Sequence, residues 1–381
     1  MRGKQLTRTA GQACYNDAVK NTTPPTPRSV LCWGRSDPGY SRNRILRQGY
    51  AALGWRVLDF QPRFSRGADW EAALRLRGRV DLVWVPCFRQ RDIAAAARWA
   101  RRRGVPLLFD PLISAYDKQV FERGKLDEHS AAARRLLQNE RHQFALADAV
   151  LADTEAHAAF FREVLKVSAE KIYVVPVGAE ENLFTPQAWP AGAAPLEALF
   201  FGSFIPLQGP EVIVEAARLY RGPPLRWCLL GNGPLRAQCE RAAQGLSPVS
   251  FEDWLPYQQL PARIQRASIV LGIFGTTPKA QRVIPNKVYQ ALACARPVIT
   301  LRSEAYPPAL LTRENSGLHW VMAGDARALA DAVAELAERR ATLAQDGLQA
   351  RRSFDEFFSQ DSINDRLRQA VAAATSTPVR G

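Results

Sequence analysis

Short apolar runs alternate with longer amphipathic stretches over most of the chain. In the first half, apolar runs at 29–33, 55–60 and 80–86 predict buried strands, and the pattern between them, for example at 44–53, has the period of a helix. The alternation stops in a Pro-, Ala- and Gly-rich segment and resumes at residue 197. Strands that alternate with helices are typical of α/β domains with parallel sheets. The pattern therefore predicts two α/β domains in succession.

The expected division of the chain follows from these breaks in the pattern. A chain of 381 residues is long enough for two domains of ordinary size. A helical pattern from Phe354 to Ala374 lies beyond the last expected strand, so we expect a separate C-terminal helix. The predicted segments are a disordered tail at 1–28, a first domain at 29–185, a linker at 186–195, a second domain at 196–352 and a C-terminal helix with a tail at 353–381.

The stretch from Ile269 to Thr300 carries the clearest local signal for a ligand site. An apolar run from Ile269 to Phe274 predicts a strand, the polar loop 275–282 follows it, and a helical pattern begins at about Lys287. In open α/β sheets, ligands bind in the crevice at the carboxyl ends of the strands. We therefore expect this loop to face a binding cleft.

The start of the following helix has the features of an anion site. Asn286 fits the N-cap position, because its side-chain oxygen can accept a hydrogen bond from an amide of the first turn. The free amides of Lys287, Val288 and Tyr289, together with the helix dipole, would then attract a phosphate. Lys279, Arg282 and Lys287 supply positive charge nearby. An ordinary helix start with solvated basic residues explains the same local pattern equally well.

The composition narrows the possible chemistry. Hydrophobic residues make up 47% of the chain, as in a globular protein. The four histidines in the whole sequence argue against a metal site built from histidine. The six cysteines show no CxxC pair and no metal-ligand spacing, and several lie in apolar runs. We therefore expect reduced, buried thiols in a cytoplasmic protein, and no metal site.

The net charge of +14 is compatible with three kinds of partner: nucleic acid, an anionic membrane surface and an anionic small substrate. No basic stripe with interleaved aromatic residues is found, so we expect no nucleic-acid partner. No apolar run approaches the ~20 residues of a transmembrane helix, and the start of the chain lacks the apolar core of a signal peptide. The expected location is the cytoplasm, and peripheral binding at the inner membrane face stays open as an alternative.

The stretch described above resembles a known enzyme family. Gln290-Ala291-Leu292-Ala293 and Pro297-Val298-Ile299 are similar to the donor-site segment of retaining GT-B glycosyltransferases of family 4, the glycosyl transferases group 1. Pro285-Asn286-Lys287 resembles a variant of that segment, and the turn at Gly231–Pro234 resembles the family's Gly-Asp/Asn-Gly-Pro turn. The resemblance covers roughly residues 29–370.

The resemblance implies a fold and a reaction. The fold is α/β, with two Rossmann-like domains that face each other across a cleft and a C-terminal helix that crosses back to the first domain. The second domain holds a nucleotide-diphosphosugar as co-substrate. The first domain holds the acceptor, which is a sugar, a lipid-linked molecule or another small molecule. The transfer retains the anomeric configuration and needs neither a divalent metal nor another cofactor, because protein cations and helix termini stabilise the leaving diphosphate.

The resemblance also assigns roles to residues. Two further assignments go beyond the family motif and give the expected catalytic residues: Asp110, which follows a strand and faces the reacting sugar, and Arg282, which with Lys279 replaces the missing cations of the Gly202 loop. A simple turn or capping role is the alternative for Asp110. The expected acceptor-binding residues are Arg42, Asn43 and Asp117. Arg42 and Asn43 are expected in a loop that lines the acceptor side, and a simple turn explains that loop equally well. The expected donor-binding residues are Gly202, Ser203, Gly209, Gly231, Asn232, Trp254, Lys279, Pro285, Asn286, Lys287, Val288 and Gln290.

Four positions depart from the family pattern. Arg282 and Gln290 stand where the family has two glutamates, and Ser203 and Gln208 stand where its glycine-rich loop has two cations. These departures leave a second possibility, a non-catalytic relative that binds nucleotide sugars. A nucleic-acid-binding protein, suggested by charge alone, is the third. Binding of a labelled nucleotide sugar with transfer to an acceptor separates the first two, and a nucleic-acid shift at physiological salt tests the third.

Overall fold

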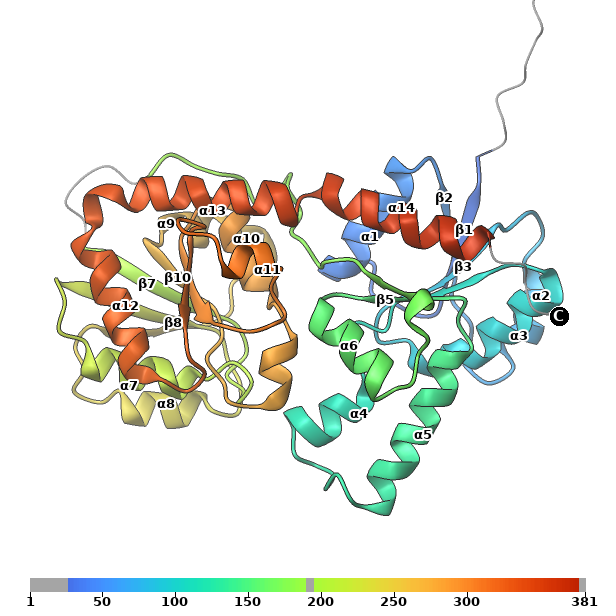
Figure 1. Cartoon of the computed structure of the whole chain (residues 1–381), viewed down its shortest axis with the longest axis horizontal. Coiled ribbons are helices and arrows are strands. Elements are labelled where there is room, and N and C mark those ends of the chain that lie inside the picture. The colour runs from blue at the N-terminus through green and yellow to red at the C-terminus, as the bar shows by residue number, and fades with distance from the viewer. Residues whose placement is uncertain (1–26, 190–194, 377–381) are drawn as a thin grey trace, which may run out of the picture.

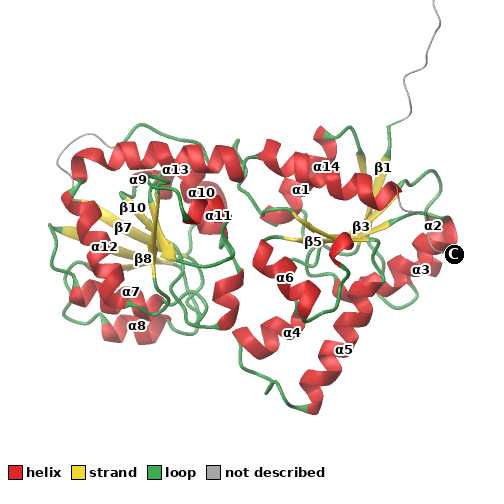
Figure 2. Ribbon diagram, viewed as in Figure 1, coloured by secondary structure: helices red, strands yellow, loops and turns green. Residues whose placement is uncertain are grey.

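The computed structural model describes residues 27–189 and 195–376 of the chain. Two six-stranded parallel sheets, each flanked by helices, form the two halves of the molecule (Figures 1 and 2). This arrangement confirms the expected fold of two Rossmann-like α/β domains. Residues 1–26 of the expected tail and 190–194 of the expected linker lie outside the described residues.

The first domain contains the sheet with strand order β2-β1-β3-β4-β5-β6. Its strands are β1 (Ser29–Trp33), β2 (Arg56–Phe60), β3 (Leu82–Val85), β4 (Leu107–Phe109), β5 (Ala149–Ala152) and β6 (Ile172–Val174). Its helices are α1 (Ser41–Ala52), α2 (Ala68–Arg75), α3 (Ile93–Arg103), α4 (Ala115–Asp117), α5 (Ala131–Ala145) and α6 (Glu155–Glu163). Short helical turns occur at η1 (Gln90–Asp92), η2 (Lys118–Glu122) and η3 (Ala169–Lys171).

The second domain contains the sheet with strand order β12-β11-β10-β7-β8-β9. Its strands are β7 (Leu196–Phe201), β8 (Leu225–Leu230), β9 (Val249–Glu252), β10 (Ile269–Leu271), β11 (Val298–Leu301) and β12 (Leu318–Val321). Its helices are α7 (Pro210–Leu219), α8 (Arg236–Ala242), α9 (Leu260–Arg266), α10 (Asn286–Ala293), α11 (Pro308–Leu311) and α12 (Ala326–Glu338). The helical turns η4 (Tyr257–Gln259), η5 (Pro278–Arg282) and η6 (Arg340–Thr342) complete it.

The central strands of both sheets are buried on both faces. Leu31 and Val83 of the first sheet, and Leu199 and Val270 of the second, are fully buried. When helices cover both faces of a parallel sheet, neither face is solvated. The central strands then have apolar side chains at consecutive positions. This is why the strand positions could be predicted from the apolar pattern.

The C-terminal part of the chain forms two helices. The helical pattern expected from Phe354 to Ala374 is interrupted, because α13 (Leu343–Phe357) ends and α14 (Gln360–Ser376) begins within it. The side chain of Ser359 accepts a hydrogen bond from the amide of Ser362 at 3.3 Å, which caps the new helix. α13 packs against α10 of the second domain, whereas α14 packs against α1 and β5 of the first (Figure 1).

α14 contributes side chains to the core of the first domain. Ile363, Leu367 and Ala370 are fully buried in one cluster with Trp84 and Leu108 of the first sheet. Burial of each large apolar side chain stabilises the fold by about 1.5–3 kcal/mol. The first domain is therefore completed by the last helix of the chain.

From the sequence we expect buried, reduced cysteines and no transmembrane helix. The five cysteines in the described ranges are all buried and free, and Cys14 lies outside those ranges. Within residues 27–189 and 195–376, every helix falls short of the length or the apolar character that crossing a membrane requires.

Candidate functional site

A cavity of about 580 Å³ opens between the two domains, at the carboxyl ends of their strands. We refer to it as the central cavity. Its lining from the first domain includes Tyr40, Phe88, Lys118, Glu122, Asp153 and His157. Its lining from the second domain includes Gly202, Ser203, Gln208, Trp254, Tyr257, Lys279, Pro285, Asn286, Lys287 and Gln290. The cavity thus collects eight of the expected donor-binding residues around one space.

Lys287, in the first turn of α10, forms the floor of this cavity. Its side-chain Nζ donates to Gln208 Oε1 at 2.5 Å and to the carbonyl oxygen of Gly272 at 3.2 Å, and it lies 3.6 Å from the centre of the Phe200 ring. Only 4% of the residue is exposed, and this burial lowers the pKa of Lys287 well below its usual value. No carboxylate among the described residues pairs with it. A buried cation without such a partner favours an anionic ligand.

The start of α10 differs from the expected capping arrangement. Asn286 is already the first helical residue, Pro285 precedes it, and no side chain caps the helix. The predicted N-cap role of Asn286 is therefore wrong, although its side chain does line the cavity. The amide of Val288 donates to the carbonyl of Pro285 at 2.9 Å, and its side chain is fully buried. Val288 consequently offers neither group to a ligand, and the free amides of this turn are those of Asn286 and Lys287.

The loop after β7 approaches Lys287 closely. Gly202 has a φ of +147°, and a Cβ built there would lie 2.9 Å from Gln208 Oε1 and 3.1 Å from Lys287 Nζ. A glycine at this position lets the backbone lie beside the lysine head group. Ser203 lines the cavity next to it.

Three expected donor-binding residues support this loop from outside the cavity. A Cβ on Gly231 would lie 2.1 Å from the carbonyl oxygen of Gly202, so the two loops can touch only if residue 231 is a glycine. Gly209 has a φ of +64° and begins α7. The exposed Asn232 side chain accepts from the amide of Gly233 at 2.7 Å. These three residues position the Gly202 loop and are not part of the cavity lining.

The mouth of the cavity is lined by an exposed aromatic side chain and a chain of polar groups. Trp254 is 54% exposed there. Gln290 Nε2 donates to the hydroxyl of Tyr257 at 3.3 Å, and that hydroxyl donates to Glu180 Oε2 at 2.7 Å. Because Glu180 belongs to the first domain, this chain connects Gln290 to the opposite side of the cleft.

The residues expected on the acceptor side are buried beneath the cleft. Arg42 and Asp110 are fully buried and pair with each other, with Nη2 and Oδ1 3.0 Å apart. Arg42 Nη1 also donates to the carbonyls of Val175 and Pro176, each at 2.7 Å. The prediction that Asp110 faces the cleft is wrong, because its carboxylate is enclosed by Arg42.

Asn43 is buried in the same region. Its Nδ2 donates to the carbonyl of Asp37 at 2.7 Å, and its Oδ1 accepts from the thiol of Cys87 at 3.3 Å. The physical reason is that α1 begins at Ser41, so Arg42 and Asn43 lie in its first turn and face the sheet. The expectation that both residues lie in a loop lining the acceptor side is therefore corrected.

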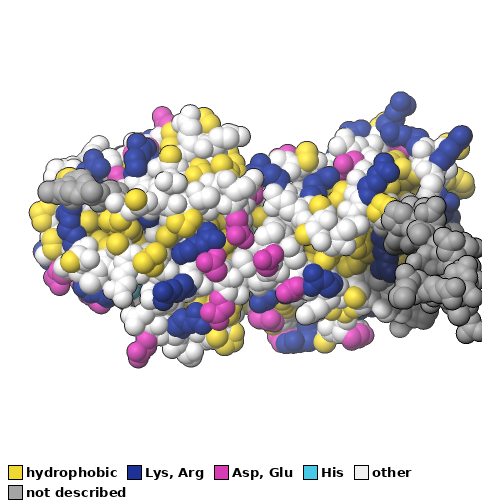
Figure 3. All heavy atoms as spheres, turned by 90° about the horizontal axis from the view of Figure 1, so that it is seen from above, with side chains coloured by type: hydrophobic (Ala, Val, Ile, Leu, Met, Phe, Trp, Pro, Cys, Tyr) yellow, Lys and Arg dark blue, Asp and Glu magenta, His cyan; other side chains and the backbone are white. Residues whose placement is uncertain are grey.

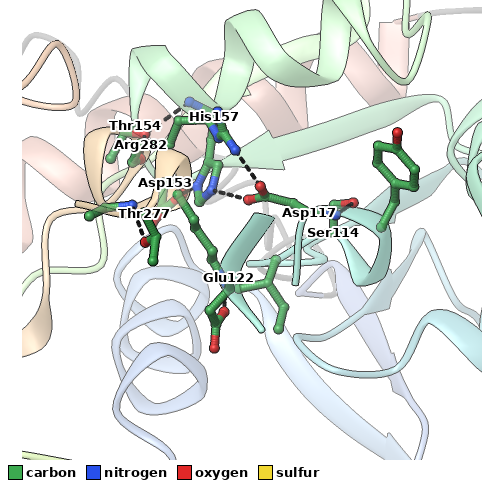
Figure 4. A network of polar contacts seen from close by, with 12 residues as sticks. Ser114, Asp117, Glu122, Asp153, Thr154, His157, Thr277 and Arg282 are labelled. Carbon is green, nitrogen blue, oxygen red and sulfur yellow. Dashed lines mark hydrogen bonds and ion pairs between the residues drawn. The ribbon is translucent and has the colours of Figure 1, made fainter. Parts of the chain in front are cut away.

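Two ion pairs and a hydrogen bond join η5 of the second domain to the first domain (Figure 4). Arg282 Nη2 pairs with Asp117 Oδ1 at 2.5 Å, and Lys279 Nζ pairs with Glu122 Oε2 at 2.5 Å. The hydroxyl of Thr154 donates to the carbonyl of Arg282 at 2.7 Å. We call these contacts the interdomain bridge. They connect segments that lie more than a hundred residues apart in the sequence.

The interdomain bridge corrects the expected roles of Arg282 and Asp117. The Arg282 guanidinium lies over the rings of Phe160 and Phe121, at 4.8 and 5.4 Å from their centres, and it is not part of the central cavity lining. It is therefore not placed to bind a diphosphate there. Asp117 is fully buried, so it binds Arg282 and does not face an acceptor. Lys279 does line the cavity, but its charge is neutralised by Glu122.

His157 is a charged group that the sequence reasoning missed. Its Nδ1 lies 2.5 Å from Asp153 Oδ1, and its Nε2 lies 3.7 Å from Asp117 Oδ2, as Figure 4 shows. Burial alone would lower the pKa of His157, but Asp153 and Asp117 together raise it to about 9. The imidazole is therefore protonated at neutral pH. The available signal was the spacing of four residues between Asp153 and His157, with Thr154 capping α6 between them.

A second cavity, of about 800 Å³, lies beside Arg282. Its lining includes Phe160, Gln281, Arg302 and Met322. Of the expected site residues it contains Arg282, and the glycine loop and the start of α10 line the central cavity instead. We therefore place the candidate site in the smaller, central cavity.

Both halves of the chain match known protein families. Residues 26–178 match the glycosyl transferase 4-like domain, and residues 195–339 match the glycosyl transferases group 1. The chain is 30% identical over 215 residues to the provisionally assigned colanic acid biosynthesis glycosyltransferase WcaL of Escherichia coli K12, covering 54% of this chain and 52% of WcaL. It is 26% identical over 210 residues to the O-antigen chain mannosyltransferase C of Escherichia coli, covering 53% and 55%. The chain thus spans about half the length of these curated relatives.

Solved structures share the architecture at low sequence identity. Anabaena HepE in complex with UDP has a TM-score of 0.66 and 15% identity, over 91% of this chain and 100% of HepE. Sucrose-phosphate synthase from Thermosynechococcus elongatus has a TM-score of 0.70 and 18% identity, over 92% of this chain and 100% of that protein. At these identities the likeness is one of fold. The chain thus has the GT-B fold, and each of its halves matches a glycosyltransferase family model.

Proposed function

We propose that the protein transfers a sugar from a nucleotide-diphosphosugar in the central cavity to an acceptor on the first-domain side, with retention and without a divalent metal. The observation that carries the proposal is Lys287, a buried cation at the start of a helix that no described carboxylate neutralises. A diphosphate would supply the missing negative charge. Negative charge grows on the diphosphate as its bond to the sugar breaks, and a fixed cation stabilises that charge.

The remaining lining residues fit the other parts of such a donor. The exposed ring of Trp254 at the mouth offers a surface on which a base can stack. Gln290, which also lines the cavity, can donate to or accept from a ribose hydroxyl. The backbone at Gly202 leaves room for a phosphate beside Lys287. These assignments place the nucleoside toward the mouth and the diphosphate on the floor.

The known proteins that resemble this chain suggest the first substrates to test. HepE was solved with UDP and with UDP-glucose, which makes uridine the first base to examine. The curated relatives are named for colanic acid biosynthesis and for the O-antigen chain. We infer that the acceptor here is also a saccharide or a saccharide carrier.

A non-catalytic nucleotide-sugar-binding protein is the second candidate. The observation that favours it is that Asp110 and Arg282, the two residues expected to be catalytic, both lie outside the central cavity. In an enzyme with this arrangement, Lys287 and the donor's own phosphates would have to provide most of the electrostatic stabilisation. The two candidates differ in turnover and not in donor binding.

Titration with nucleotide sugars followed by a transfer assay tests the proposal. We expect at least one of UDP-, GDP- and ADP-glucose to bind, and the label of the bound sugar to move to a saccharide acceptor in the presence of EDTA. Proton NMR of the product should show the anomeric configuration of the donor. Binding without transfer or donor hydrolysis would favour the second candidate, and no binding of any nucleotide sugar would refute both.

The distribution of charged and apolar side chains on the surface is relevant to membrane binding. On the face seen in Figure 3, Lys and Arg side chains are interspersed with Asp and Glu and do not form one stripe. Around α2, however, three large apolar side chains are exposed, Phe64 at 75%, Trp70 at 67% and Leu74 at 80%. The exposed arginines at 63, 66, 75 and 77 lie in the same segment. We propose that this segment binds an anionic membrane surface peripherally.

The membrane proposal predicts salt-dependent binding to vesicles. Sedimentation with phosphatidylglycerol vesicles should fall steeply as salt rises from about 0.05 M to about 0.5 M, because the arginine charges are screened. Replacing Trp70 with serine should weaken sedimentation at low salt, and neutral vesicles should bind little. Sedimentation that is absent at low salt, or unchanged by either salt or the Trp70 substitution, would refute this role of the segment.

A further inference from the structure

A groove of about 420 Å³ in the first domain runs up to the central cavity. Its walls come from the loop after β3, the segment after β4 and one face of α5. It shares Phe88, Ile113 and Lys118 with the lining of the central cavity. We call it the side groove. A molecule lying in it would reach the central cavity, where the donor is proposed to bind.

The side groove contains cations that the protein does not neutralise. Lys118 is half-buried, and its side chain makes no hydrogen bond or ion pair with any residue in the described ranges. Burial, Arg123 and Lys279 lower the pKa of Lys118 against the opposing effect of Glu122, whose carboxylate pairs with Lys279 and not with Lys118. Arg91, exposed at the groove, likewise pairs with no described carboxylate. Arg89 also lines the groove, but it pairs with Asp92.

The acidic residue in the groove does not neutralise these cations. Glu140 on α5 is 1% exposed, and its carboxylate accepts three hydrogen bonds. They come from Ser114 Oγ at 2.5 Å, the amide of Ala115 at 2.7 Å and the amide of Tyr116 at 2.9 Å. Its oxygens are thus used to fix the segment after β4. The charge that the groove offers to a ligand is therefore positive.

The junction of the groove with the central cavity carries a strained aromatic residue. Phe88 has a φ of +63°, a left-handed conformation that is strained for a bulky residue. Its ring is 45% exposed and packs edge-on against Tyr40, with ring centres 5.1 Å apart. Strain of this kind persists where the surrounding structure imposes it, often at ligand sites. An exposed ring at this point can pack against the apolar face of a sugar.

From these features we propose that the side groove binds an acceptor carrying a phosphate or diphosphate. The anionic group lies against Lys118 and Arg91, and the acceptor's sugar lies against Phe88 and points into the central cavity. This inference rests on the proposed transfer of a sugar and names the class of its acceptor. The same chemistry occurs in a free sugar phosphate and in a lipid-linked diphosphate, and the test distinguishes the two.

The test uses protein saturated with UDP, so that the donor site is filled, and three probes followed by calorimetry. Glucose 1-phosphate represents a sugar phosphate, farnesyl diphosphate represents a lipid diphosphate, and methyl α-glucoside is the neutral control. We expect at least one of the two phosphate probes to bind at least tenfold more tightly than the methyl glucoside. A preference for glucose 1-phosphate indicates a free acceptor, and a preference for farnesyl diphosphate indicates a lipid-linked one.

Substitutions locate the binding. Arg91→Gln and Lys118→Gln should each weaken binding of the preferred probe at least fivefold. Arg91→Gln should leave UDP affinity unchanged, because Arg91 is not part of the central cavity lining. Arg101→Gln, at an exposed arginine of α3 outside the groove, is the matched control and should change neither affinity. A thermal melt of each variant checks that the fold is retained.

The outcomes that overturn the inference are distinct from those that overturn the proposed function. Phosphate probes that bind no better than methyl glucoside, or an affinity that neither Arg91→Gln nor Lys118→Gln reduces, would refute the side groove as the acceptor site. Absence of UDP binding would refute the proposed function. In that case the same probes, titrated without UDP, still report whether the groove binds phosphate.

Discussion

Replacing Lys287 with methionine should weaken the binding of UDP, or of whichever nucleoside diphosphate the protein prefers, by roughly 10- to 150-fold. This range corresponds to the about 1.5–3 kcal/mol of a charge-assisted hydrogen bond. Methionine is unbranched and similar in length but lacks Nζ, so the substitution removes the positive charge together with its contact with the Phe200 ring. Isothermal titration of the parent and the variant measures the difference.

The folding stability of the Lys287→Met variant provides the control. Burying a lysine without a carboxylate partner costs free energy, so an apolar side chain of equal size should leave the thermal midpoint unchanged or higher. Lys125→Met, at an exposed position, should alter neither quantity. Affinity should also decline as pH rises through the pKa of Lys287, which burial lowers below the usual value for lysine. An affinity within twofold of the parent would remove Lys287 from the donor site.

Replacing Asp117 with asparagine should destabilise the protein by about 3 kcal/mol or more. The carboxylate is fully buried and neutralises both Arg282 and His157, and removing one partner of a buried ion pair leaves an uncompensated charge. Asparagine preserves the volume, so the loss is electrostatic. Chemical denaturation at pH 7 measures it. A change within about 0.5 kcal/mol of the parent, like that expected for Asp365→Asn in an exposed pair with Arg368, would contradict the prediction.

The pH dependence of stability gives an independent check on the same group. The pKa of His157 is raised to about 9, so the ion pairs of the imidazolium stabilise the fold fully below its unfolded pKa of ~6.5. That stabilisation is lost as pH rises from there through about 9. In the Asp117→Asn variant the pKa of His157 should fall, and the decline in stability over this pH range should become smaller. An unchanged pH profile would show that Asp117 does not act on His157.

The ion pair between Arg282 and Asp117 also determines the effect of a glutamate at position 282. A carboxylate there would face Asp117 at the distance now occupied by the guanidinium, and two like charges would repel. Arg282→Glu should therefore destabilise the interdomain bridge, although the family that this sequence resembles has a glutamate at the matching position. The arginine that stands in place of the family's glutamate thus has an acidic partner, Asp117, in the other domain.

The donor side of the site could be predicted because its parts are close in sequence. Strand β10, the loop and α10 form one continuous unit, so the apolar run placed Lys287 and Gln290 at the carboxyl end of a strand before the fold was known. The glycines of the second domain were expected from the family resemblance, which includes the turn at Gly231–Pro234. The predicted start of the helix at Asn286 was wrong by one residue, which is within the ordinary uncertainty of a helix boundary.

The first-domain side could not be predicted because its partners are distant. Arg42 meets Asp110 across 68 positions, and Arg282 meets Asp117 across 165, so no local pattern reports either pair. Asp110 and Arg282 were therefore assigned to a ligand. In the structure Asp110 is neutralised by Arg42 of the same domain, and Arg282 by Asp117 of the other domain. His157 was recognisable only through its spacing from Asp153, and that spacing is common in helices.

The packing of α14 onto the first sheet has a consequence for synthesis on the ribosome. The first domain is the first to be made, but the cluster around Trp84 and Leu108 is closed only by Ile363, Leu367 and Ala370. Nascent chains generally fold domain by domain from the N-terminus. Here the second domain must emerge before α14 covers the rest of that face, so the sheet is covered there only in part, by α1, while the second domain is being made. Such a face is the kind of surface that chaperones bind.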